Sequence, residues 1–192
     1  AGCPRKRHGS STIGIAMVTS TREPPDGGAS TDPLPRQEML ATVAAQVAAI
    51  DTLIGIAKHS IRVFDVDLSA MGWNDPTRAE RIVAFLRASP AAKLEIIVHD
   101  TSWIERSCPR LTNLLKYRGH AITIRRTGQD ARHAMDPLVI VDGIHFVHRF
   151  HVAQPRAAFS IGDPVTAQPL VSRFDAISED AEPGLTATQL GL

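Results

Sequence analysis

The chain has 192 residues, of which 43% are hydrophobic and 21% are charged, and its formal net charge is +1. A chain of this length can bury one sizeable core but is short for two independent domains, so we expect one globular domain with a tail. A charge this close to neutral, without a run of five or more like charges, argues against a strongly basic nucleic-acid binder and against an acidic tail.

Cysteine usage and apolar runs bear on the compartment. Cys3 and Cys108 lie far apart, so we expect neither a disulfide framework nor a cysteine-based zinc site, which fits a reducing, cytoplasmic compartment. Basic residues 5–7 precede an apolar run at residues 13–18, but that run is too short for a signal peptide and no A-x-A site follows it. The chain has no apolar run of 18 residues, so the sequence predicts no transmembrane span.

Residues 1–35 are rich in proline, glycine, serine and threonine and carry few large apolar side chains. Such a composition buries too little surface to offset the loss of chain entropy, so we expect a disordered N-terminal tail or linker. The folded domain is predicted at residues 36–192.

The domain begins with alternating helix and strand patterns. Apolar residues spaced three and four apart predict a helix from residue 36 to about residue 57, and period-two alternation predicts a strand over residues 61–68. Asp75 followed by Pro76 is an N-cap with proline at the first helical position, and Ser89-Pro90 ends that helix.

Three further elements follow. Residues 93–100 predict a strand whose continuous apolar centre indicates burial on both faces. A helix that includes Leu111, Leu114 and Leu115 is predicted to end at Gly119, which suits a C′ position. Residues 121–126 then predict a third strand.

A hairpin and a last helix complete the pattern. Residues 138–141 predict a buried strand, Asp142-Gly143 a tight turn, and Ile144 the start of a second strand. The last helix is predicted to start at Pro169 and to bury Phe174. This order of elements predicts an α/β domain with a mixed β-sheet and helices on both faces.

Several sequence segments, together with this order of elements, resemble one half of the phospholipase D-like superfamily. They are Ile97-Val98-His99-Asp100, Leu114 to Gly119, Ile122-Thr123-Ile124-Arg125, Asp142-Gly143 and the closing helix at Phe174. The whole of residues 36–192 is similar to an uncharacterised bacterial phospholipase-D-like domain family. The resemblance implies that fold. It also implies a homodimer, because members with one motif per chain assemble their site across a two-fold axis.

The catalytic motif of the resembling superfamily is His-x-Lys-x4-Asp-Gly, and this chain matches only its end. When Asp142 is placed on the motif's aspartate, Met135 stands where the nucleophilic histidine belongs and Pro137 where the phosphate-binding lysine belongs. A thioether is not a useful nucleophile toward phosphorus, and proline carries no charge. The motif is therefore degenerate.

Histidines and arginines near the hairpin are the candidates to replace the missing pair. His133 is the candidate catalytic residue, with Asp142 to orient it. The candidate ligand-binding residues are Arg125, Arg132, His145 and Arg149. Along the second hairpin strand, His145, Val147, Arg149 and His151 share one face, and we expect this polar face to be available while the opposite face is core.

The sequence predicts neither a metal site nor a cofactor. His145 and His151 lie about 20 Å apart at the usual rise of a strand, which is too far to share an ion. Asp65, Asp67 and Asp100 at strand ends would suit a magnesium-dependent phosphotransfer enzyme, but the nucleophile context is incomplete.

Three functions are compatible with these residues. We favour a catalytically inactive binding or interaction module with a phosphate-containing ligand. The runner-up is a phosphodiesterase or phosphatidyltransfer-type enzyme that uses His133 with arginine in place of lysine. The third is a nucleic-acid-binding accessory protein with an Arg/His surface. Asp142 also has a structural explanation, because Asp-Gly favours positive φ in a tight turn; on that account Asp142→Asn should be nearly neutral.

Overall fold

A computed structural model describes residues 1–2 and 36–186 of the chain. Apart from its first two residues, the tail predicted at residues 1–35 lies outside the described part. All the elements below belong to the unit Asp32–Leu192. Within the described residues, no helix is long and apolar enough to cross a membrane.

An eight-stranded sheet forms the centre of the domain, in the order β1-β7-β6-β5-β2-β3-β4-β8. The strands are β1 (Arg36–Leu40), β2 (Ser60–Asp65), β3 (Lys93–Val98), β4 (Ile122–Arg126), β5 (Leu138–Val141), β6 (His145–Arg149), β7 (Ala157–Ile161) and β8 (Glu182–Pro183). The neighbours β2, β3 and β4 run parallel, and the other pairs are antiparallel. Ile96, Ile97 and Val98 in β3 are fully buried, as expected for a strand covered on both faces.

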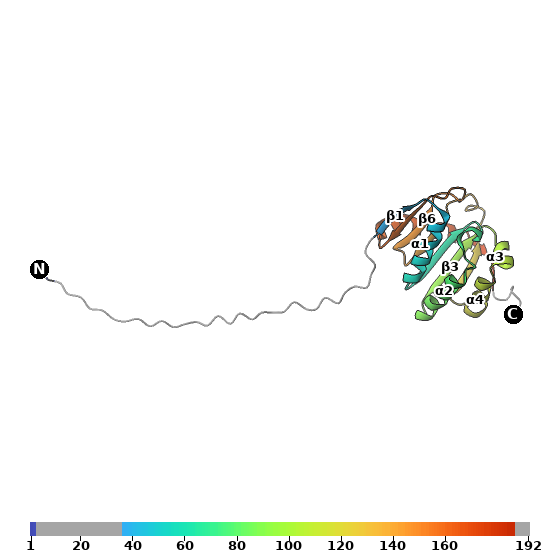
Figure 1. Cartoon of the computed structure of the whole chain (residues 1–192), viewed down its shortest axis with the longest axis horizontal. Helices are drawn as coiled ribbons and strands as arrows, with labels where there is room; N and C mark the ends of the chain where they lie inside the picture. Colours follow the sequence, from blue (N-terminus) through green and yellow to red (C-terminus); the bar gives the residue numbers. More distant parts are fainter. Residues whose placement is uncertain (3–35, 187–192) are drawn as a thin grey trace. The chain divides into compact units, whose positions relative to one another are not determined.

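Helices cover both faces of this sheet. They are α1 (Val43–Ile56), the short 3-10 helix η1 (Ser69–Met71), α2 (Pro76–Ala88), α3 (Ser102–Ser107), α4 (Pro109–Arg118) and α5 (Pro164–Glu179). Figure 1 shows α1 and α2 in front of the sheet. Their apolar side chains share one core with α4, whereas Phe174 and Ile177 of α5 pack with Phe64 and Ile97 on the opposite face. This arrangement confirms the predicted α/β class.

The prediction of a helix from residue 36 is wrong for its first seven residues, 36–42. Residues Arg36–Leu40 form strand β1, which pairs antiparallel with β7. The helix starts at Val43, because Thr42 is extended and its side chain accepts a hydrogen bond from the Ala45 N–H. Met39 continues the helical spacing by coincidence and is 55% exposed on the edge strand.

The last helix starts five residues earlier than predicted. Asp163 accepts a hydrogen bond from the Thr166 N–H and Pro164 is the first helical residue, so Pro169 lies inside α5. Strand β7 just before it and helix α3 were not predicted, since both are short and lack a clear period. Gly119 does end α4, but its φ of −56° is not left-handed.

The predicted hairpin is confirmed. Strands β5 and β6 pair antiparallel, and the Ile144 N–H donates to the Val141 carbonyl across the turn. Asp142 and Gly143 have φ values of 53° and 71°. The connection is one residue longer than expected, because Val141 pairs with His145 and the second strand starts there.

Gly143→Val is expected to lower the free energy of unfolding by about 1–3 kcal/mol, because a β-branched residue is strained at positive φ. A Cβ at this position would meet no atom within 4 Å, so backbone strain is the main expected cost. A urea titration of the variant measures it. An unchanged unfolding midpoint would show that the turn tolerates a different backbone geometry.

Candidate functional site

Most of the polar side chains of interest lie along the edge of the sheet that is formed by the ends of its strands. The parallel strands β2, β3 and β4 end at this edge, and the antiparallel strand β5 begins there. In open α/β sheets ligands bind outside the carboxyl ends of the strands, where the strand order reverses. Asp65 ends β2, His99 follows β3, Thr127 follows β4, and Asp136 precedes β5.

His99 ties the segment between β4 and β5 to the end of β3. Its Nδ1 lies 2.7 Å from Thr127 Oγ1, and its Nε2 lies 2.7 Å from the carbonyl oxygen of Ala134. A carbonyl oxygen can only accept, so Nε2 carries a hydrogen, and the Thr127 hydroxyl donates to Nδ1 when the ring is neutral. Both ring nitrogens are thus used to hold Ala134, the residue before Met135.

Met135 and Pro137, which stand at the histidine and lysine positions of the resembling motif, lie at this edge of the sheet. The Met135 side chain is 38% exposed, and its carbonyl oxygen accepts a hydrogen bond of 2.7 Å from the Val152 N–H. Pro137 is buried, and its carbonyl oxygen accepts a hydrogen bond of 2.8 Å from the Arg149 N–H. Neither side chain offers a nucleophile or a charge.

Asp136, between these two, is held by side chains from α5 and β6. Arg173 donates from Nε to Oδ2 at 2.6 Å and from Nη2 to Oδ1, so the pair is bidentate. His148 Nε2 lies 3.4 Å from Oδ2. Burial alone would raise the pKa of Asp136, but the contacts with His148 and Arg173 outweigh it and lower the pKa to about 2. Asp136 is therefore ionised and already paired at neutral pH.

A hollow of about 310 Å³ opens beside this pair, and we call it the histidine hollow. It is lined by His133, Ala134, Met135, Asp136, His148, Phe150, His151 and Arg173. Phe150 is 43% exposed, so the hollow combines apolar surface with three imidazoles and one guanidinium. Asp136 is its one acidic residue, and that charge is balanced by Arg173.

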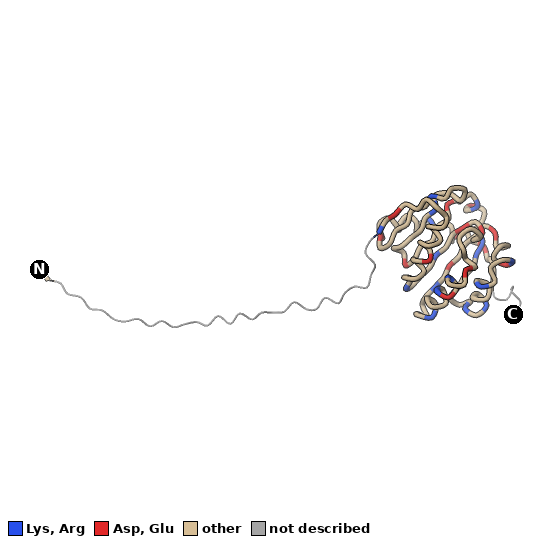
Figure 2. Tube along the Cα trace, viewed as in Figure 1, with Lys and Arg blue, Asp and Glu red and all other residues tan. Residues whose placement is uncertain are grey.

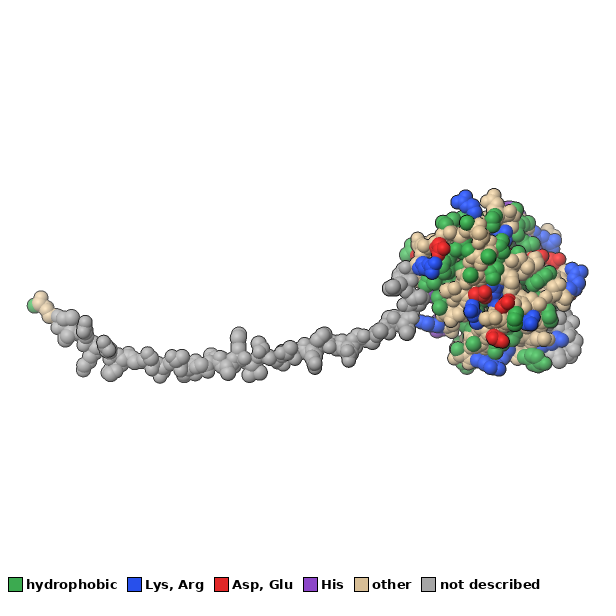
Figure 3. Space-filling view, viewed as in Figure 1, with side chains coloured by type: hydrophobic (Ala, Val, Ile, Leu, Met, Phe, Trp, Pro, Cys, Tyr) green, Lys and Arg blue, Asp and Glu red, His purple; other side chains and the backbone are tan. Residues whose placement is uncertain are grey.

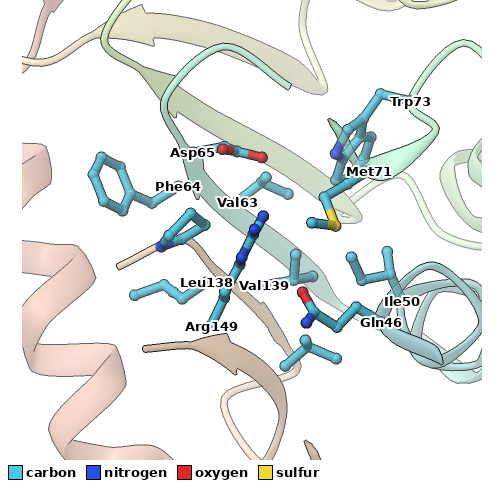
Figure 4. Close-up of a pocket in the computed structure, with 12 residues that line it drawn as sticks. Gln46, Ile50, Val63, Phe64, Asp65, Met71, Trp73, Leu138, Val139 and Arg149 are labelled. Atoms are coloured by element: carbon cyan, nitrogen blue, oxygen red, sulfur yellow. The ribbon is translucent and has the colours of Figure 1, made fainter. Parts of the chain in front are cut away.

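A smaller cavity is lined by Pro137, among other residues, and Figure 4 labels others that line it. The side chain of Arg149 runs from β6 toward Asp65, with Gln46 of α1 beside it. The cavity volume is about 20 Å³, room for about one water molecule. Gln46 donates from Nε2 to the carbonyl oxygen of Pro155, while its buried Oε1 has no partner among the described residues.

Asp65 is the unusual acid of this cavity. Burial raises the pKa of its carboxyl to about 6; the Asp67 carboxylate adds to the rise, while the Val66 N–H and Arg149 oppose it. Perturbed acids of this kind cluster at functional sites, although structural networks produce them too.

The structure places the predicted catalytic residues at opposite ends of β5. His133 precedes the strand and is exposed, and its side chain makes no hydrogen bond within the described residues. Asp142 follows the strand, and its carboxylate accepts hydrogen bonds of 2.7–2.8 Å from the backbone N–H groups of Lys58, His59 and Ser60. Asp142 therefore fastens the hairpin turn to the start of β2 and does not contact His133.

The four predicted ligand-binding residues do not converge. Arg125 of β4 donates to the Ser178 carbonyl and hydroxyl at the end of α5. His145 and Arg149 lie at the two ends of β6, four strand spacings from β4, or about 19 Å. Arg132 is exposed on the loop before β5 and Arg125 is partly exposed, whereas His145 and Arg149 are buried.

The prediction of an available polar face on β6 is wrong for His145 and Arg149, while His151 just after the strand is exposed and lines the histidine hollow. His145 and Arg149 are buried, at 6% and 8% exposure. His145 Nδ1 accepts a hydrogen bond from the Gly162 N–H, and Arg149 Nε donates to the Gln154 carbonyl. The opposite face carries His148 and Phe150 into the histidine hollow, because α5 covers only part of that face.

The three aspartates considered for magnesium do not form a site. Asp67 accepts hydrogen bonds from Ser69, and Asp100 from Ser102, so each stabilises a local turn. Among the residues that the structure describes, no three His, Cys, Asp or Glu side chains gather as metal ligands.

Sequence reasoning missed Asp136, His148 and Arg173 as site residues. Asp136 lies between the two motif positions, and this proximity was the available signal. Arg173 had none, because it is 37 residues away in a helix that was predicted only for its apolar face.

Comparisons with known proteins agree with this architecture. The model of a family described as Domain of unknown function (DUF7931) matches residues 42–189. No curated protein sequence matches the chain.

Similar solved structures include Nuc from Salmonella typhimurium, a phospholipase D family member, with 16% identity, a TM-score of 0.56, and coverage of 79% of this chain and 99% of Nuc. NucT from Helicobacter pylori has 14% identity, a TM-score of 0.51, and coverage of 78% and 99%. TrmBL2, an archaeal chromatin protein described with a novel mode of DNA binding, has 13% identity, a TM-score of 0.59, and coverage of 78% of this chain and 54% of its own. The chain thus spans about half the length of TrmBL2. These similarities confirm the phospholipase D-like fold.

Proposed function

The chain belongs to the DUF7931 family, and from this premise we propose that it is a phospholipase D-like domain that binds a phosphate-containing ligand in the histidine hollow without hydrolysing it. The observation that carries the proposal is the hollow itself. It is lined by Met135, which stands at the motif's histidine position, whereas Pro137 at the lysine position lines the smaller cavity. The hollow holds one guanidinium and three imidazoles but no matched nucleophile.

The absence of a nucleophile argues against turnover. Met135 and Pro137 cannot attack phosphorus or clamp a phosphate. His133 is the one histidine of the hollow on the β4–β5 loop, yet no described side chain orients its ring. Nucleophilic histidines need such a partner, so His133 is better suited to bind an anion than to form a covalent intermediate.

Arg173 is the group best placed to hold a phosphate. Its bidentate bond to Asp136 uses Nε and Nη2 and leaves the two Nη1 hydrogens for another acceptor. The pair also fixes the guanidinium in space, which lowers the entropy cost of binding a ligand. His133, His148 and His151 surround the same opening.

Arg173→Met is expected to weaken the binding of methyl phosphate at least fivefold at pH 7, measured by calorimetric or NMR titration. Because this variant leaves Asp136 without its arginine, the double variant Asp136→Asn/Arg173→Met separates loss of the cation from exposure of the acid, and it should bind as weakly. Arg87→Met, which removes an exposed arginine of α2, is the control and should bind like the unchanged protein.

Equal affinity of the Arg173→Met variant and the unchanged protein would contradict the proposal. So would turnover of bis(4-nitrophenyl) phosphate that disappears in His133→Ala, since it would establish the enzyme that uses His133 with an arginine.

Nucleic-acid binding has less support. TrmBL2 shares the fold, but Figure 2 shows Lys and Arg of this domain interspersed with Asp and Glu along the chain, and the face in Figure 3 carries both signs. A phosphate-backbone surface requires clustered cations. The homodimer that the resemblance implies stays a prediction.

A further inference from the structure

One side of α5 lines a second hollow that adjoins the histidine hollow. Its helix wall consists of residues at helical spacing, Pro169, Ser172, Arg173, Ala176, Ile177 and Asp180, and its other wall is the loop at residues 130–134. The volume is about 430 Å³. Both hollows are lined by His133, Ala134 and Arg173, so they meet at these residues and form one groove, which we call the α5 groove.

The groove is large enough for a ligand that carries a second chemical group besides a phosphate. Eleven residues separate the ends of the helix wall, which corresponds to about 16 Å. Ligand sites of small molecules usually enclose about 300–1,000 Å³. A simple phosphate placed at Arg173 would occupy only the junction and leave the second hollow empty.

The loop at residues 130–134, which forms the other wall of the second hollow, is anchored to the end of α5. Asp180 Oδ2 accepts a hydrogen bond of 3.0 Å from the Asp130 N–H. A Cβ at Gly128 would collide with Asp180, so the loop approaches the helix as closely as only glycine allows. The loop that presents Asp130 and His133 is therefore held at both ends, by Asp180 and by the bond from His99 to Ala134.

The polar groups inside the second hollow suit hydroxyl groups. The side chains of Asp130 and Ser172 are exposed and make no hydrogen bond within the described residues. A ligand hydroxyl can donate to the Asp130 carboxylate and also accept from the Ser172 hydroxyl, whereas an amine can only donate. Ala131, Ala134 and Ala176 are small and leave room for a ring between the larger Pro169, Ile177 and Asp180 of the same lining.

We propose that the α5 groove binds a phosphorylated sugar or polyol, with the phosphate at Arg173 and His133 and the hydroxyl groups along Asp130 and Ser172. This inference rests on the proposed function, because it takes the phosphate site at the junction as given and adds the nature of the group attached to the phosphate.

The test compares ligands that share a phosphate but differ in what it carries. Methyl phosphate, glucose 6-phosphate and O-phosphoethanolamine are titrated into the full chain by calorimetry at pH 7. We expect glucose 6-phosphate to bind at least tenfold more tightly than methyl phosphate and more tightly than O-phosphoethanolamine.

Variants of the second hollow should remove this preference alone. Asp130→Ala and Ser172→Ala are each expected to weaken glucose 6-phosphate about three- to tenfold and to leave methyl phosphate unchanged. Gln168→Ala changes an exposed residue of the same helix that lines neither hollow, and it should alter neither affinity.

The outcomes separate the two proposals. Equal affinity for glucose 6-phosphate and methyl phosphate would overturn the inference and leave the phosphate site standing. Tighter binding of O-phosphoethanolamine than of glucose 6-phosphate would also overturn it, because the hollow would then take an amine. Failure of every phosphate compound to bind would overturn both.

Discussion

Asp142→Ala is expected to lower the free energy of unfolding by about 3 kcal/mol, because it removes a carboxylate that accepts three backbone hydrogen bonds. Lys58 and His59 are exposed, so water compensates part of the loss at their N–H groups. For a domain of this size the melting temperature should fall by roughly 6–12 °C. Thermal melts of the variant and of Glu179→Ala, an exposed acid of α5, measure the difference.

The same geometry corrects the expectation that Asp142→Asn is nearly neutral. The Lys58 N–H donates to Oδ2, while His59 and Ser60 donate to Oδ1. Asparagine can keep the bonds to one oxygen, but its amide nitrogen is a donor and would face another donor. We now expect a cost of about 1–2 kcal/mol for this variant. A melt identical to that of the unchanged protein would show that the turn alone accounts for the aspartate.

Neither change at Asp142 should affect ligand binding. Strand β5 separates this residue from His133, a distance of about 13 Å along four strand residues. The affinity for methyl phosphate should therefore stay the same in every folded Asp142 variant. A weakened affinity for methyl phosphate together with an unchanged melting temperature would show that Asp142 contributes to the binding site.

Asp65→Asn is expected to stabilise the domain at pH 8 by on the order of 2–3 kcal/mol. Burial raises the pKa of Asp65 from 3.8 to about 6, so at pH 8 the fold holds a charge that it disfavours. Asparagine resembles the protonated form and can still accept the hydrogen bond of the Val66 N–H. Chemical unfolding at pH 8 measures the difference.

The contribution of Asp65 to the free energy of unfolding depends on pH in a definite direction. Between about pH 3.8 and pH 6 the folded chain keeps a proton at Asp65 that the unfolded chain releases. Stability from this group therefore rises as pH falls from above 6 toward 3.8, and the advantage of Asp65→Asn should shrink over that range. Glu80→Gln is the control, because it removes the charge of an exposed acid of α2 that is not among the groups that shift the pKa of Asp65. A constant difference between the variant and the unchanged protein from pH 8 to pH 4 would contradict a buried, ionising Asp65.

Local chemistry was enough to predict several elements from the sequence. Asp75-Pro76 predicted the start of α2 because a capping side chain and a preset φ act within one turn, and the Asp75 carboxylate does accept the Arg78 N–H. Asp142-Gly143 predicted the hairpin because few residues adopt positive φ. The identities of Met135 and Pro137 are read directly from the sequence, and the resemblance places them at the motif's histidine and lysine positions.

Other features depended on what each segment packs against. Residues 36–40 carry a helical spacing, yet they form β1 because the open edge of β7 offers a full set of backbone hydrogen bonds. Period-two alternation put His145 and Arg149 on one face of β6, but it could not tell which face α1 would cover and which face α5 would leave open. Burial of a polar side chain is decided by its neighbours in space, not by its neighbours in the chain.

The candidate site itself was beyond local reasoning. Asp136 and Arg173 meet across 37 residues because α5 crosses the sheet where β5 begins, and the hollow beside them exists only once both elements are packed. The sequence by itself determined the hairpin and the residue types at positions 135 and 137, since each follows from residue identity or short-range backbone preference, and its resemblance to the phospholipase D-like superfamily predicted the fold. Which charges face one another, and where an opening is left between them, was decided only by the tertiary structure, because a charge pair and a hollow arise from side chains that long-range packing brings together.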